Sequence, residues 1–113
     1  MASDQSTTGS TPVACSLSQP DLEGRESRWE ALAARALTER ANTAQGVRLS
    51  FRPEPGAEDE LRALAAAETE CCSWATWRVH VSPAQLILYV SAAGDGAYAL
   101  QLMFAGLQPP AGA

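Results

Sequence analysis

The change in hydrophobic periodicity around the Pro-Glu-Pro-Gly run at 53–56 constrains the fold more than any other feature of this chain. Before this run, apolar and polar residues alternate from Val47 onward, which predicts a half-buried strand. The prolines and the glycine end that pattern. After them, apolar residues recur at the spacing of one helix face from Ala57 to Cys72. The chain therefore has to pack a sheet against at least one helix.

The same periodicities predict six elements in all. They are helices over about 21–45, 57–72 and 95–107, and strands over 47–53, 74–82 and 85–91. A short Ser-Pro-Ala connection separates the last two strands, which should form an antiparallel hairpin. We predict an α+β fold, a small two-layer sandwich of about three strands arranged as in a split β-α-β unit. Because a helix connects the first two strands, they should be parallel if they are neighbours.

The chain of 113 residues has the length of one compact domain. Residues 1–12 are polar and lack apolar periodicity, so we predict a disordered tail there. Residues 13–108 form the predicted single α+β domain. Its first segment is an arm that carries Cys15.

Charge and hydropathy exclude several classes of partner. The net charge of −5 argues against direct binding of nucleic acid, which needs a basic face. The apolar runs are far shorter than the ~18–20 residues that span a membrane. The Ser/Thr-rich N-terminus lacks the apolar core of a signal peptide. We therefore expect a cytoplasmic protein without a membrane partner, in a compartment where cysteines stay reduced.

Two adjacent cysteines, Cys71 and Cys72, end the second predicted helix. In a reducing compartment, such thiols are more typical of metal binding or redox chemistry than of a structural disulfide. Thiolate is the preferred ligand of soft ions. With Cys15 the pair would make a three-sulfur set suited to Hg(II) or As(III), whereas Zn(II) would need a fourth ligand from Glu68, His80 or water. The alternative is that the cysteines merely pack as small apolar residues.

Glu68 lies four residues before Cys72, so both belong to the apolar face of the predicted helix. A buried carboxylate is paired, bound to a metal, or protonated, because burying it ionised and alone is unfavourable. Three arginines are candidate partners: Arg25, Arg28 and Arg78.

The cysteine motif resembles that of a family of small, largely uncharacterised bacterial proteins, which occur alone or beside regulators of the mercury-resistance type. The matching features are the run Leu64-x3-Glu68-x2-Cys71-Cys72-x-Trp74, the segment Cys15-x-Leu17, and the strand from Val47 to Phe51. Family members carry Glu-x-x-Cys-Cys-x-Phe, and Trp74 stands at the position of the Phe. The resemblance covers about residues 13–107. It implies a role in resistance or sensing of a thiophilic metal or metalloid, centred on the three cysteines and Glu68.

The favoured hypothesis is a binding protein that buffers, carries or senses Hg(II) or As(III). One alternative is an enzyme that cleaves organomercurials, in which Cys71 and Cys72 hold mercury and Glu68 protonates the leaving carbon. A thiol-redox enzyme and a plain interaction domain are the others. The chain lacks the DNA-binding helix-turn-helix of the mercury-resistance-type regulators beside which proteins of the similar family occur. A separate regulator and a second copy of the chain remain open as protein partners.

Overall fold

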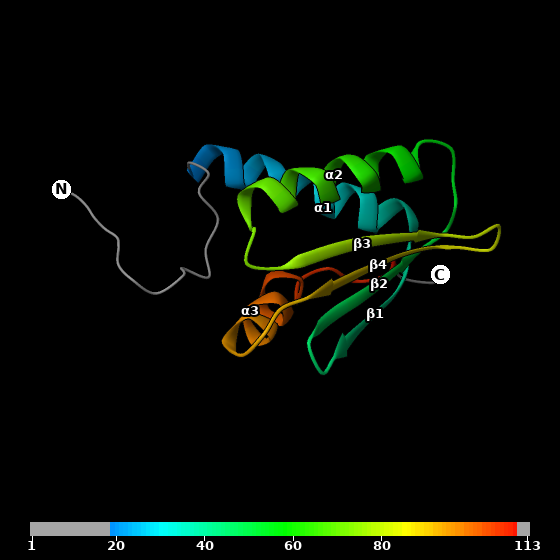
Figure 1. The fold of residues 1–113 in the computed structure, drawn as a ribbon. Helices are drawn as coiled ribbons and strands as arrows, with labels where there is room; N and C mark the ends of the chain where they lie inside the picture. The colour runs from blue at the N-terminus through cyan, green and yellow to red at the C-terminus, as the bar shows by residue number, and fades with distance from the viewer. Residues whose placement is uncertain (1–18, 111–113) are drawn as a thin grey trace.

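A four-stranded antiparallel sheet forms the base of the fold, and three helices pack against it (Figure 1). The computed structural model describes residues 19–110. In chain order the elements are α1 (Gln19–Ala36), β1 (Leu37–Thr43), β2 (Gly46–Phe51), α2 (Ala57–Cys71), β3 (Thr76–Val81), β4 (Leu86–Ser91) and α3 (Asp95–Met103). The sheet order is β1-β2-β4-β3. The predicted α+β class is therefore confirmed.

One face of the sheet carries the core. The register of β2 and β4 places apolar residues opposite one another, in the pairs Val47–Val90, Leu49–Leu88 and Phe51–Leu86. Residues directly opposite in an antiparallel pair share a face, so these side chains point the same way. Buried residues of all three helices, among them Leu32, Leu64 and Leu100, join them in one hydrophobic cluster. The helices therefore cover this face.

The prediction of one helix over 21–45 is wrong in its second half. The helix ends at Ala36, and the next seven residues form β1, an edge strand paired with β2. The described sheet therefore has four strands where three were expected. Gly46 is the first residue of β2. A side chain at Gly46 would collide with the backbone carbonyl of Val90, so the strands can approach only with glycine there.

The first two predicted strands, β2 and β3 in the structure, run parallel to one another, but they are not neighbours in the sheet. Strands β2 and β3 each pair antiparallel with β4, so they run parallel to one another with β4 between them. This is the split β-α-β arrangement, with α2 as the crossover. The predicted hairpin of β3 and β4 is confirmed.

The other predicted bounds agree with the structure to within about two residues, except that α3 ends at Met103 instead of 107. The predicted tail over 1–12 and the arm with Cys15 lie outside the described residues. Among the described residues, no helix has both the length and the apolar character needed to cross a membrane.

Candidate metal centre

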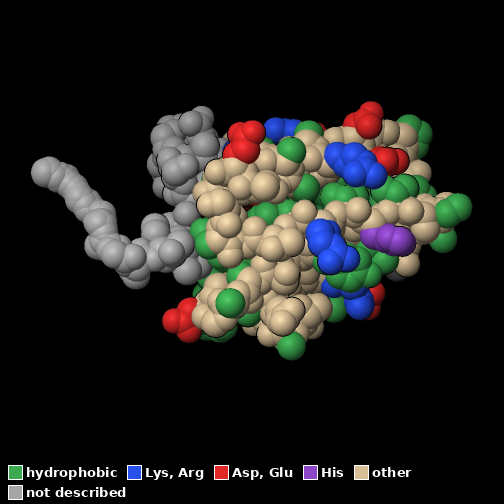
Figure 2. All heavy atoms as spheres, in the orientation of Figure 1, with side chains coloured by type: hydrophobic (Ala, Val, Ile, Leu, Met, Phe, Trp, Pro, Cys, Tyr) green, Lys and Arg blue, Asp and Glu red, His purple; other side chains and the backbone are tan. Residues whose placement is uncertain are grey.

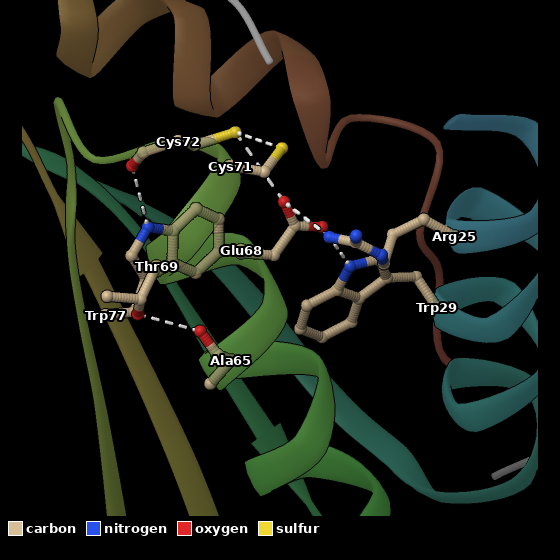
Figure 3. Close-up of polar contacts among 8 residues, drawn as sticks. All are labelled: Arg25, Trp29, Ala65, Glu68, Thr69, Cys71, Cys72 and Trp77. Carbon is tan, nitrogen blue, oxygen red and sulfur yellow. Dashed lines mark hydrogen bonds and ion pairs between the residues drawn. The ribbon is translucent and has the colours of Figure 1, made fainter. Parts of the chain in front are cut away.

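The last turn of α2 brings Glu68, Cys71 and Cys72 together (Figure 3). Their ligand atoms, one carboxylate oxygen and two sulfurs, all lie within 4.8 Å of one another. Glu68 and Cys72 are four residues apart, so they occupy the same side of the helix. The helix ends at Cys71, and the φ of −122° and ψ of 63° of the next residue, Cys72, are not helical. This departure from the helix lets two consecutive cysteines direct their sulfurs to one region.

Glu68 is buried, and its carboxylate is engaged from both helices of this layer. Trp29 of α1 donates a hydrogen bond from Nε1 to Oε2 at 2.8 Å. Arg25, also on α1, places Nη1 3.4 Å from Oε1. The Cys72 thiol donates to the same Oε1 at 3.6 Å. Of the states expected for a buried carboxylate, the structure therefore has the paired one, with Arg25 as the arginine.

The two cysteines differ in environment. Cys72 is free and only 1% exposed. Burial, together with the negative charge and the hydrogen bond of Glu68, raises the pKa of its thiol to about 11. Cys71 is half-buried and disulfide-bonded in this structure. The two sulfurs are 3.5 Å apart. The pair can therefore act as two thiolates only after Cys71 is reduced and Cys72 has lost its proton.

One hydrogen-bond donor of Arg25, next to Glu68 and the cysteines, has no acceptor among the described residues. Its Nη1 is close enough to Glu68 for an ion pair, but among the described residues this buried atom has no hydrogen-bond partner. A buried donor without an acceptor is unfavourable by roughly 1–3 kcal/mol. An oxygen atom of a ligand bound next to the thiols would give Arg25 the acceptor that it lacks.

Aromatic ring contacts connect Trp29, which binds the carboxylate, to Trp77 of β3. Phe104 packs edge-on against Trp29, with ring centroids 5.3 Å apart, and against Trp77 at 5.9 Å. Trp77 also donates from Nε1 to the backbone carbonyl of Cys72 at 3.3 Å. The segment after α3 thereby fixes the position of both Trp29, which binds Glu68, and Trp77, which binds the chain at Cys72.

The structure unites three of the five predicted ligands. His80 lies on β3 opposite Ile87, on the sheet face away from the helices, and is not in the group formed by the described residues. Cys15 lies outside the described residues. The role of Trp29 was not foreseen, although a buried indole N–H usually finds an acceptor and a carboxylate on a neighbouring apolar stripe is an obvious one.

Comparisons with protein-family models, with curated proteins and with solved structures found no match.

Proposed function

We propose that the reduced protein binds one soft metal or metalloid ion through Cys71 and Cys72, as a buffer, carrier or sensor of that ion. The observation that carries the proposal is the approach of both sulfurs and the Glu68 carboxylate to within 4.8 Å of one another. Thiolates select soft ions over hard ones such as Mg²⁺ and Ca²⁺, which prefer oxygen ligands. The site is therefore matched to a thiophilic ion.

The separation of the two sulfurs, in a structure in which Cys71 is disulfide-bonded, suits As(III) better than Hg(II). For bonds of about 2.3 Å, the length of a zinc–thiolate bond, the 3.5 Å between Cys71 Sγ and Cys72 Sγ corresponds to an S–ion–S angle of about 100°. A pyramidal trivalent ion has angles near this value. A two-coordinate Hg(II) ion holds its ligands on opposite sides, and at the same bond length its sulfurs would be about 4.6 Å apart.

The exchange that loads the site is balanced without an oxidant. Arsenous acid and two thiols give two arsenic–sulfur bonds, and two hydroxyl groups leave with the two thiol protons as two waters. One hydroxyl then stays on arsenic, where Arg25 Nη1 is a donor without an acceptor. In this proposal Cys15 is the third ligand, and its thiol would displace the last hydroxyl as a third water.

The surroundings of Glu68 favour binding over cleavage of a carbon–metal bond. Cleavage would need an acid that delivers a proton to the leaving carbon. Glu68 instead accepts hydrogen bonds on both oxygens, from Trp29 and Cys72, and pairs with Arg25. We assign Glu68 to holding the Cys72 thiol in place and to balancing the charge of Arg25.

Native mass spectrometry tests the proposal. The full chain is reduced, freed of reductant without air, and exposed separately to As(III), Hg(II), Zn(II) and Cu(I). We expect one equivalent of As(III), with an adduct mass that distinguishes one retained hydroxyl from none and so reports on Cys15. Cys72→Ser should lose the adduct, and Arg62→Gln, a change on the exposed side of α2, should keep it. Absence of any ion on the reduced chain would contradict the proposal.

A further inference from the structure

The sheet face opposite the helices, which we call the open face, carries a row of charged and aromatic residues. Tyr89 of β4 lies directly between two arginines, because it pairs with Arg48 of β2 on one side and with Arg78 of β3 on the other. Two strand spacings, about 10 Å, separate the backbones of the arginines. Figure 2 shows this face, with blue and purple side chains over β3, green ones over β4, and blue next to red over β2 and β1.

The two arginines of this row differ in their contacts. Arg48 forms an ion pair with Glu39 at 3.1 Å. Arg78 is exposed, and it has no ion pair or side-chain hydrogen bond within the part of the chain that the structure describes. Tyr89 is 39% exposed beside it. The row therefore offers one uncompensated cation next to an accessible aromatic ring.

A hollow of about 370 Å³ lies at this end of the open face. Its polar lining comes from two sources, the open face itself and the turn between β1 and β2: Arg78, Tyr89, Ser91, Thr43 and Gln45. The volume is at the lower end of the range of sites that take small ligands. Hydroxyl and amide groups beside a guanidinium are suitable partners for the oxygens of an anion.

We propose that this hollow binds a small molecule that carries a planar ring and an anionic group. The ring would lie on Tyr89, where stacking is favourable, and the anionic group would be bound by Arg78, whose planar guanidinium matches carboxylate and phosphate oxygens. Two sources have this chemistry, a nucleoside monophosphate and an aromatic carboxylate.

Charge restricts the ligand to a small one. Glu39 is the one acidic residue that the strands place on the open face, and Arg48 already neutralises it. The spot around Arg78 is therefore positive, although the whole chain carries a charge of −5. A single anion gains from the local cation, whereas a long strand of phosphates also meets the repulsion of the acidic molecule.

Amide chemical shifts of the full chain, followed by NMR, test the proposal. The probes are adenosine monophosphate and 1-naphthoate as the two sources, with adenosine and inorganic phosphate as halves of the ligand. We expect one or both complete probes to shift amides around Arg78, Tyr89 and the β1–β2 turn with saturation. Each half should bind at least about fivefold more weakly, because it lacks either the stacking or the charged contact.

Two variants and a control locate the site. Arg78→Gln should weaken binding of the preferred probe about tenfold or more, because a charge-assisted hydrogen bond is lost. Tyr89→Leu keeps apolar area but removes the ring, and it should weaken binding at least about fivefold. Arg62→Gln, on α2 and outside the hollow, should leave binding unchanged.

The proposal fails if neither complete probe shifts these amides, or if Arg78→Gln binds as tightly as the wild type. A single-stranded oligonucleotide that binds more tightly than the mononucleotide would also overturn it, in favour of a nucleic-acid surface. The NMR spectrum of each variant reports directly whether it is folded. Because none of the residues that line the hollow belongs to the candidate metal centre, this test is independent of the ion-binding test.

Discussion

Two arginine–glutamate pairs join α1 to α2, and they differ mainly in their exposure to solvent. Arg28 and Glu60 form the better geometry, with two parallel hydrogen bonds of 2.9 and 3.0 Å, but their side chains are 48% and 31% exposed. Arg25 and Glu68 are 3.4 Å apart without a hydrogen bond, and their side chains are only 15% and 5% exposed. One pair thus has the better geometry and the other the deeper burial, so mutating each shows which property has the larger effect on stability.

The difference in burial should decide which of the two pairs contributes more to the free energy of unfolding. Solvent competes for the exposed charges, so a surface pair typically contributes up to about 1 kcal/mol even with good geometry. Removing one partner of a buried pair leaves the other charge unsolvated, at about 3–5 kcal/mol. The buried pair is also the one beside the thiols, so the polar environment that makes it sensitive to mutation is the environment of the candidate site.

The largest expected effect is that of Glu68→Ala. The variant leaves the Arg25 guanidinium without its counterion and the Trp29 indole N–H without its acceptor, and we expect the free energy of unfolding to fall by about 3–5 kcal/mol. Denaturant melts measure it. Glu68→Gln retains an oxygen that can accept the hydrogen bond from Trp29, so its free energy of unfolding should fall less than that of Glu68→Ala. A loss below about 1 kcal/mol for the alanine variant would show that the buried pair resembles the exposed one.

Alkaline pH should weaken the fold through Cys72. Burial and Glu68 raise the pKa of its thiol from 9.0 to about 11, so the folded state holds this proton more tightly than the unfolded state. The resulting stability is complete below about pH 9 and is lost as pH rises toward 11, by up to about 2–3 kcal/mol. Melts between pH 8 and 11 should show a decline that is smaller in Cys72→Ser. Equal slopes for the two proteins would contradict this assignment.

Trp29→Phe tests the hydrogen bond to the carboxylate separately from the packing of the ring. The substitution keeps an aromatic ring against Phe104 but removes the Nε1 donor to Glu68. We expect a loss of about 1–2 kcal/mol in the free energy of unfolding. In the double variant with Glu68→Ala, the two losses should not add fully, because each change alone already removes the hydrogen bond between Trp29 and Glu68. Additive losses would mean that Trp29 acts through packing alone.

The smallest expected effect is that of Glu60→Gln. The variant removes one charge of the exposed pair, and we expect a loss of less than about 1 kcal/mol, which should shrink further as salt screens the interaction. Melts at low and high ionic strength give the comparison. A salt-independent loss as large as that of Glu68→Ala would remove the distinction between the two pairs.

Local patterns predict the elements whose sequence and environment agree, and they fail where pairing with another strand decides. The alternation around Leu49 and the stripe from Ala57 to Cys72 were sufficient for β2 and α2. Residues 37–43 are different, since Leu, Glu, Arg and Ala all favour a helix. These residues form an edge strand because their backbone hydrogen-bonds to β2. The partner follows directly in the sequence, but the turn residues Ala44 and Gln45 carry none of the Asn-Gly or Asp-Gly signals that reveal a two-residue hairpin loop.

In the candidate site, too, some contacts were predictable from the sequence and others were not. The four-residue spacing of Glu68 and Cys72 was sufficient to place them on one helix face. The choice of Arg25 over Arg28 was not predictable, since it depends on how α1 lies across α2. In the fold Arg25 lies next to Glu68, whereas Arg28, which is three residues farther along α1, lies next to Glu60.

X-ray absorption at the arsenic edge tests the central claim most directly, because it identifies the atoms bound to the ion. The reduced full chain, loaded with one equivalent of As(III), should show arsenic bonded to at least two sulfurs. Cys72→Ser should have no bound arsenic, whereas Glu60→Gln should match the wild type. A shell of oxygen alone, or a sulfur shell unchanged in Cys72→Ser, would contradict an ion site at Cys71 and Cys72.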